Sequence, residues 1–107
     1  MKTCKAKIRW LTNRIPPIVP PEKRKKQTAY SPIILFSEQP SCLSVESLNR
    51  EEVVWSSIIF NEEINGQYTI SSVSFGVPEA PIELMRPGAK FALFEGPRKV
   101  AEGEIID

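Results

Sequence analysis

The sequence predicts an all-β protein, namely a single antiparallel β-barrel of about six strands formed by one domain over residues 1–107. Three observations predict this fold. Short apolar runs recur at roughly ten-residue spacing and are separated by turn residues. Several runs alternate apolar and polar residues, as strands with one buried face do. No segment shows the sustained 3.6-residue apolar period of an amphipathic helix.

The strands are expected at defined places along the chain. Residues 5–11 form the first, because Ala6, Ile8 and Trp10 alternate with basic residues. In residues 30–36, Pro32 lacks an amide donor and favours an edge or bulge position. Residues 49–52 are expected to form a turn, and residues 82–85 either a short strand or a turn. The remaining strands are expected over 42–48 (the weakest), 53–60, 67–75, 89–94 and 100–106.

Two hairpin turns have recognisable chemistry. Asn65–Gly66 lies between two β-branched and aromatic runs and is the strongest short hairpin signal in the chain. At Gly96–Pro97, the proline ring fixes φ near roughly −65°, which excludes a type I′ turn. A type II′ turn needs glycine first and a negative φ second. Gly96–Pro97 therefore predicts a type II′ turn between the last two strands.

The last hairpin also resembles a known family. Residues 88–106 read Gly-Ala-Lys-Phe-Ala-Leu-Phe-Glu-Gly-Pro-Arg-Lys-Val-Ala-Glu-Gly-Glu-Ile-Ile and are similar to the final hairpin of bacterial elongation factor Tu. Residues 29–36, Ala-Tyr-Ser-Pro-Ile-Ile-Leu-Phe, resemble an upstream strand of that family, and residues 5–11 more weakly resemble the strand that opens the same domain. The three segments follow the family's order, whereas residues 37–82 match poorly. The resemblance implies a divergent, stand-alone C-terminal β-barrel domain of elongation factor Tu.

Residues 12–28 are expected to form a Pro-rich and basic loop, which is longer than the corresponding loop of elongation factor Tu. Its prolines exclude a helix or a central strand and predict a semi-rigid connector. Residues 1–26 hold nine Lys and Arg against one acid, a net charge of +8, and the rest of the chain carries −7. Two interpretations stay open: a basic surface that binds a partner, or pairing with the acidic body of the same domain. The tip of the loop carries Lys23, Arg24, Lys25 and Lys26.

Length and cysteine usage indicate a small cytoplasmic domain. A chain of 107 residues is long enough for one core. No apolar run reaches the roughly 18 residues of a membrane span, and the basic N-terminus lacks the apolar segment of a secretory signal. We therefore expect no membrane association. Cys4 and Cys42 are expected to be reduced thiols, with a disulfide as the less favoured alternative.

Residue types that carry most enzyme chemistry are missing. The chain has no histidine, no zinc-type cysteine spacing and no phosphate loop of the form G-x-x-x-x-G-K-[ST]. The pairs Glu51–Glu52 and Glu62–Glu63 flank expected strand ends, where solvated turn charges are usual. Glu102 and Glu104 share one strand face and are expected to protect an exposed edge. We expect no enzyme activity and no nucleotide, metal or other cofactor.

Binding remains as the expected function, and the resemblance names candidate contacts. In elongation factor Tu the equivalent of the Gly96 turn lies against the backbone of the aminoacyl-tRNA acceptor arm. The resemblance implies RNA contacts at Gly96, Arg98 and Lys99; Arg98 matches the family arginine, and Lys99 adds a charge for a phosphate. Pro97 replaces a family glycine and removes an amide donor. Ordinary hairpin-tip charges are the alternative explanation of Arg98 and Lys99.

Two hypotheses about function follow. The first is a non-catalytic module associated with RNA, tRNA-like RNA or translation, in which Gly96, Arg98 and Lys99 and the basic loop contact phosphates. The second is a small protein-binding protein, of a bacterial regulatory or immunity type, that uses the same barrel against a basic partner. The fold does not choose between them.

Overall fold

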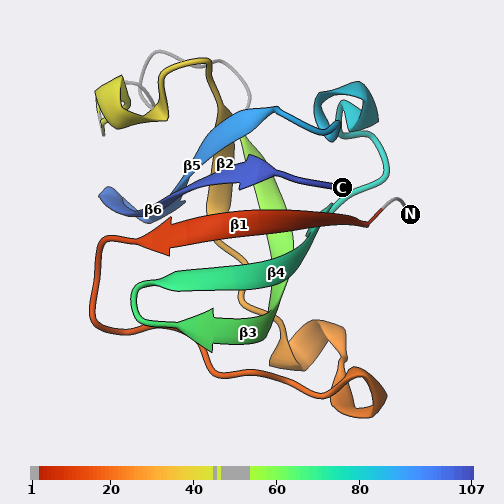
Figure 1. Ribbon diagram of the computed structural model, residues 1–107. Helices are drawn as coiled ribbons and strands as arrows, with labels where there is room; N and C mark the ends of the chain where they lie inside the picture. Colours follow the sequence, from red (N-terminus) through yellow and green to blue (C-terminus); the bar gives the residue numbers. More distant parts are fainter. Residues whose placement is uncertain (1–2, 45, 47–53) are drawn as a thin grey trace.

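Six antiparallel strands close into a barrel in the computed structural model, which describes residues 3–44, 46 and 54–107. The order around the barrel is β1-β4-β3-β2-β5-β6, and β6 pairs with β1 to close it (Figure 1). The predicted all-β barrel is confirmed. The strands are β1 (Cys4–Trp10), β2 (Ile33–Phe36), β3 (Trp55–Asn65), β4 (Tyr68–Phe75), β5 (Lys90–Glu95) and β6 (Arg98–Ile105).

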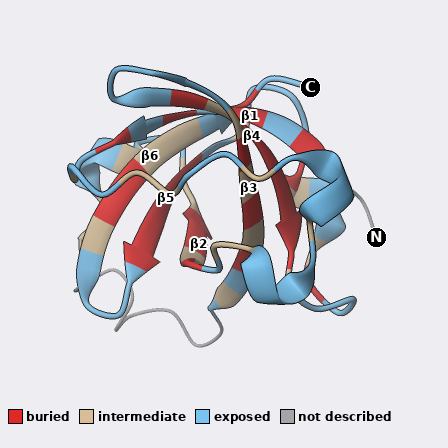
Figure 2. Cartoon of the chain, turned by 90° about the horizontal axis from the view of Figure 1, so that it is seen from below, coloured by how far each residue is buried: buried red, intermediate tan, exposed pale blue. Residues whose placement is uncertain are grey.

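Strict alternation in β1 shows how the sequence builds the barrel wall. Cys4, Ala6, Ile8 and Trp10 are buried, and the residues between them are exposed. The inward side chains of all six strands form one core, whose largest fully buried members are Trp10, Phe75 and Phe91. Burial is concentrated on the strands, whereas the short helical turns around them are exposed (Figure 2).

Strand β5 is buried on both faces. Phe91 and Leu93 belong to the main core, whereas Ala92 and Phe94 face outward and pack in a second small cluster with Leu35. Ile33 and Leu43 cover the edge of this cluster. The two-sided burial explains why residues 91–94 form a continuous apolar run rather than an alternating one.

Both tight hairpins place glycine at the first central position. Glu95 pairs with Arg98, so Gly96–Pro97 is the two-residue loop; the φ of Gly96 is +56°, as a type II′ turn requires. In the β3–β4 hairpin, the turn lies one residue later than the expected Asn65–Gly66. Asn65 pairs with Tyr68, so the loop is Gly66–Gln67, and φ of Gly66 is +64°. Asparagine ends the strand instead of entering the turn, because glycine supplies the single positive φ.

Several expected boundaries shift. The strand expected over 30–36 begins only at Ile33, and the carbonyl oxygen of Pro32 accepts hydrogen bonds from the amide and hydroxyl of Ser57, both 2.9 Å. The strand expected over 53–60 runs on to Asn65. Residues 45 and 47–53, which include the expected turn at 49–52, lie outside the described residues.

Short 3₁₀ turns occupy most of the connections. They are η1 (Pro21–Lys23) and η2 (Lys26–Thr28) in the basic loop, η3 (Pro40–Cys42) after β2, and η4 (Ile82–Leu84) before β5. The weak strand expected over 42–48 therefore starts as a helical turn in its described part. Residues 82–85, expected as a strand or a turn, form a helical turn. Prolines precede or begin three of these turns, since they fix φ and need no donor.

Candidate nucleic-acid interface

Arg24 anchors the basic loop to the barrel. Its guanidinium donates to the Val19 carbonyl oxygen (2.9 Å) and to Oε2 of Glu62 on β3 (3.2 Å). The same group lies 5.3 Å from the centroid of the Phe60 ring. With 20% of its side chain exposed, Arg24 is committed to its own domain.

A buried chain of hydrogen bonds holds the start of the loop. Nε1 of Trp10 donates to Oγ1 of Thr69 (2.9 Å), and Oγ of Ser71 donates to Oδ1 of Asn61 (2.6 Å). Asn61 in turn donates from Nδ2 to the Pro16 carbonyl oxygen (2.7 Å). Since the only proton of Ser71 goes to Asn61, the remaining 2.8 Å contact must run from Thr69 to Ser71. All protons point in one direction, from the core toward Pro16.

A hydroxyl group fixes the tip of the loop. Oγ1 of Thr28 accepts from the Lys25 amide (2.9 Å) and lies within hydrogen-bond distance of the Lys23 and Lys25 carbonyl oxygens. The tip therefore has a defined conformation, with the side chains of Lys23, Lys25 and Lys26 exposed. Across residues 3–44, 46 and 54–107, none of these three lysines forms an ion pair.

The β5–β6 turn presents only part of its expected charge. Gly96 and Arg98 are exposed. Lys99, in contrast, donates from Nζ to the Pro40 carbonyl oxygen (2.6 Å) and to Oε2 of Glu102 (2.7 Å), and only 16% of its side chain is exposed. Two of the three donors of this ammonium are used within the domain.

Tyr30 connects the end of the basic loop to the same turn. Its hydroxyl donates to the Glu95 carboxylate, and its ring packs 5.6 Å from the ring of Trp10. Burial raises the pKa of the Tyr30 hydroxyl, and the nearby Glu95 carboxylate raises it further, against a smaller opposing effect of Arg98. Tyr30 therefore stays protonated and acts as a donor.

The sequence-predicted residues do not form one continuous surface. The Gly96 turn lies at the left of the barrel in Figure 1, whereas the helical turns that carry Lys23 and Lys26 lie at the lower right. The interpretation that basic residues pair with their own domain holds for Arg24, and also for Lys5 and Arg9 of β1. The three loop lysines are the largest group of candidates that remain exposed and free of ion pairs within the described chain.

Two carboxylates each bridge two cations, and both correct an expectation. Glu62 lies inside β3 at a β-bulge and accepts from Lys5 and Arg24, so it is no solvated turn charge. These bonds hold the pKa of Glu62 below its ordinary value, and the bond from Lys5 has the largest effect. Glu102 lies on β6, which pairs on both sides, so it protects no exposed edge. Burial raises its pKa, but the bonds from Lys99 and Arg9 outweigh burial and lower it.

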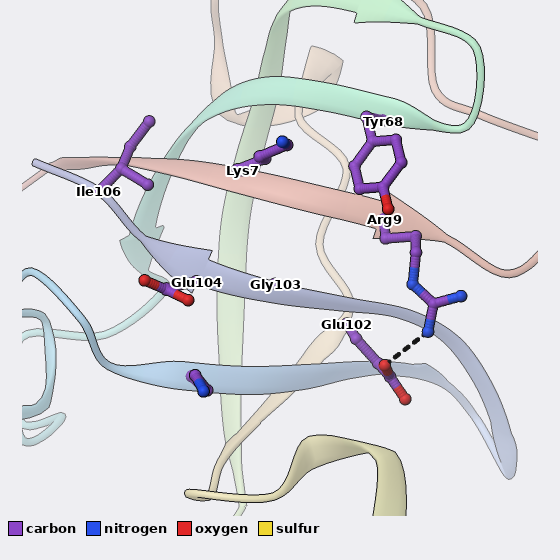
Figure 3. A pocket seen from close by; sticks show the side chains of 8 residues that line it. Lys7, Arg9, Tyr68, Glu102, Gly103, Glu104 and Ile106 are labelled. Atoms are coloured by element: carbon purple, nitrogen blue, oxygen red, sulfur yellow. Dashed lines mark hydrogen bonds and ion pairs between the residues drawn. The ribbon is translucent and has the colours of Figure 1, made fainter.

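A groove that sequence reasoning missed lies on the outer face of β4, β1, β6 and β5. Its volume is about 310 Å³, and its lining combines Lys7, Arg9, Tyr68, Lys90, Glu102 and Glu104 with Gly103 and Ile106 (Figure 3). The period-two pattern does place these polar residues on wet strand faces. Only the register, which sets Lys7 opposite Glu104 and Arg9 opposite Glu102, brings residues almost a hundred positions apart together.

Gly103 shows how closely the wall is packed beneath this groove. A β-carbon at this position would lie 2.4 Å from Cζ of the buried Phe91 ring and 3.1 Å from the Lys7 carbonyl oxygen. The ring therefore rests directly against the β6 backbone, which forms the floor of the groove.

Three further features of the described residues concern metal ligands, cysteines and membrane-spanning helices. In residues 3–44, 46 and 54–107, no three His, Cys, Asp or Glu side chains gather as a metal site would require. Cys4 is buried, Cys42 is exposed, and both are free thiols, as expected. None of the helical segments in this part of the chain has the length and apolar character needed to cross a membrane.

Comparison with known proteins adds no relative. No protein-family model, no curated protein and no solved structure matches this chain. The resemblance to elongation factor Tu therefore stays a prediction from sequence.

Proposed function

We propose that this protein is a non-catalytic RNA-binding module that contacts phosphates through Lys23, Lys25 and Lys26. The observation that carries the proposal is the difference between Arg24 and its three basic neighbours in the loop. Arg24 is held by Glu62, whereas its three basic neighbours are exposed and form no ion pair with the described chain. Ammonium groups of this kind contact the phosphate backbone without reading the base sequence.

The anchoring of the loop supports binding energetically. A flexible basic tail has to lose conformational freedom when it binds, which weakens the complex. Here the hydrogen bonds of Asn61, Arg24 and Thr28 set the conformation of the loop before any partner arrives. The three lysines are thus presented from a fixed backbone, and only their side chains need to become ordered.

The resemblance to elongation factor Tu supports a tRNA-like partner and a second contact at the β5–β6 turn. Gly96 and Arg98 are exposed there and available to a phosphate. Lys99 and Arg24 are left out of the proposed interface, because each already neutralises a carboxylate of the barrel.

A salt titration of RNA binding tests the proposal. Neutralising Z phosphates of a single strand gives a log–log salt slope of about −0.7Z. Changing Lys23, Lys25 and Lys26 together to Ser should therefore flatten the slope for a single-stranded RNA by up to about 2. The melting temperature should hardly change, since exposed loop-tip side chains carry few packing contacts.

A control removes two charges elsewhere, against three in the loop variant. Arg14 and Arg86 are exposed and form no ion pair in the described chain, so Arg14→Ser with Arg86→Ser should leave the slope nearly unchanged. Absence of binding to both single-stranded RNA and mixed tRNA at low salt, in a folded sample, would overturn the proposal and favour a protein partner. Equal flattening per charge removed in the two variants would show that only overall charge matters.

A further inference from the structure

Some charged residues around the outer groove form ion pairs within the described chain, whereas others do not. Glu102 accepts from Arg9 at 2.8 Å and from Lys99 at 2.7 Å. Lys7 and Lys90, on β1 and β5, form no ion pair in residues 3–44, 46 and 54–107. Both cations line the groove and are exposed. Two ammonium groups are therefore available to a ligand that enters it.

Glu104 restricts what that ligand can be. It lies between Lys7 and Lys90 in the strand register, opposite each of them on a neighbouring strand. Its carboxylate reduces the positive charge of the groove and disfavours a compact, multiply charged anion such as free phosphate. A singly charged phosphodiester attached to a flat, neutral group fits this charge pattern better.

Tyr68 supplies a surface for the flat group. It is the first residue of β4, and its side chain extends from β4 over β1 beside Arg9 (Figure 3). The residue is 44% exposed, so part of its ring is accessible to a ligand. Nζ of Lys7 lies 4.8 Å from the ring centroid, so a cation and an aromatic face occur together.

This combination is the one that single-stranded nucleic acids use on protein surfaces. Bases stack on exposed aromatic rings while neighbouring cations follow the backbone. The volume of about 310 Å³ lies at the lower end of the roughly 300–1,000 Å³ typical of ligand sites, which suits a single nucleotide unit.

We propose that the groove binds one nucleotide of a single-stranded RNA, with its base stacked on Tyr68 and its phosphate near Lys7 and Lys90. This inference rests on the proposed function and adds a site that recognises bases to a loop that recognises phosphates. The site tolerates any base, because every base has a π face.

Two decameric probes separate stacking from phosphate binding: oligo(A) RNA, and an abasic oligomer of the same length and charge. Tyr68→Ala should weaken binding of the full-length protein to oligo(A) about tenfold, within the range for loss of one stacking ring. Binding of the abasic oligomer should stay within about twofold, since the phosphate contacts remain. Tyr68→Phe keeps the ring and should bind both probes like the wild type. Melting curves establish that each variant is folded.

The outcomes distinguish this inference from the function on which it rests. Equal oligo(A) affinity for Tyr68→Ala and wild type would overturn the stacking site and leave the loop proposal intact. An equal loss of affinity for both probes would also overturn it, because the ring would then act without contacting a base. If the wild type binds neither probe, the proposed function fails and the stacking site fails with it.

Discussion

The two bridged carboxylates, Glu62 and Glu102, each pair with two cations but attach different segments to the barrel. Each accepts from a cation of β1, Lys5 in one case and Arg9 in the other. Each also accepts from a second cation, Arg24 or Lys99. Arg24 belongs to the basic loop, whereas Lys99 belongs to β6 and reaches the Pro40 carbonyl oxygen of η3.

The difference between these two clusters shows which cations remain unpaired and available to a binding partner. At Glu102, the bridge joins strands that already pair, and its second cation also holds η3 against β6. At Glu62, the bridge attaches the basic loop, which within the described chain meets a strand only through the isolated bridge of Ile18 with Asn61. In both cases one predicted RNA contact acts as a tether. The basic loop is the segment in which three exposed cations stay beside the tethered one.

The largest effect on stability is expected at Asn61, the buried residue that holds the start of the basic loop. Asn61→Ala removes the donor to Pro16 and leaves the Ser71 hydroxyl without its acceptor in the core. Because unpaired buried polar groups are costly, the free energy of unfolding should fall by about 2–4 kcal/mol. Urea unfolding measures it. Asn65→Ala, an exposed asparagine at the β3–β4 turn, is the control and should cost less than about 0.5 kcal/mol. Similar values for both variants would contradict a structural role of the buried chain.

The comparison of the two carboxylates can be made directly with isosteric variants. Glu62→Gln and Glu102→Gln should each lower the free energy of unfolding by about 1 kcal/mol, between the values for exposed and buried ion pairs. Only Glu62→Gln releases Arg24, so only this variant should become more sensitive to trypsin at Lys23–Lys26. Mass spectrometry of the early fragments identifies the cleaved bonds. Equal cleavage of both variants in the loop would show that Glu62 is no tether.

A smaller effect is expected from pH. The pKa values of Glu62 and Glu102 are lowered in the folded state from an ordinary 4.5. The stability that they contribute is fully present above that value and is lost as the pH falls through the lowered, folded pKa. Urea midpoints measured from pH 7 to pH 3 should therefore fall more for the wild type than for the Glu62→Gln, Glu102→Gln double variant. Parallel curves would contradict the ion-pair assignment.

Local chemistry explains which parts of the fold could be predicted. The Gly96–Pro97 turn follows from two residues, since proline fixes one φ and glycine supplies the other. The wall formed by β1 follows from the alternation of Ala6, Ile8 and Trp10. The expectation for Asn65–Gly66 missed by one position, because sequence alone does not show which residue pairs with Tyr68.

The candidate site depended on contacts that no local pattern contains. Four consecutive cations look equivalent in sequence, and only the bulge at Glu62 in β3 selects Arg24 as the tether. The groove needs barrel closure, which brings β1 between β4 and β6. In the sequence, Tyr68 is one residue of the strand expected over 67–75, and only its register opposite Arg9 places it on a charged outer face.

The most direct test compares two neighbours in the basic loop, Arg24→Ser and Lys25→Ser, by melting curves and by the salt slope of single-stranded RNA binding. Lys25→Ser should flatten the slope by about 0.7, the value for one phosphate contact, and leave the melting temperature unchanged. Arg24→Ser should lower the melting temperature by about 4–8 °C, as expected for about 1 kcal/mol in a domain of this size, with a smaller change of slope. The opposite pattern, in which Arg24→Ser flattens the slope at constant melting temperature, would contradict the division between tether and phosphate contacts.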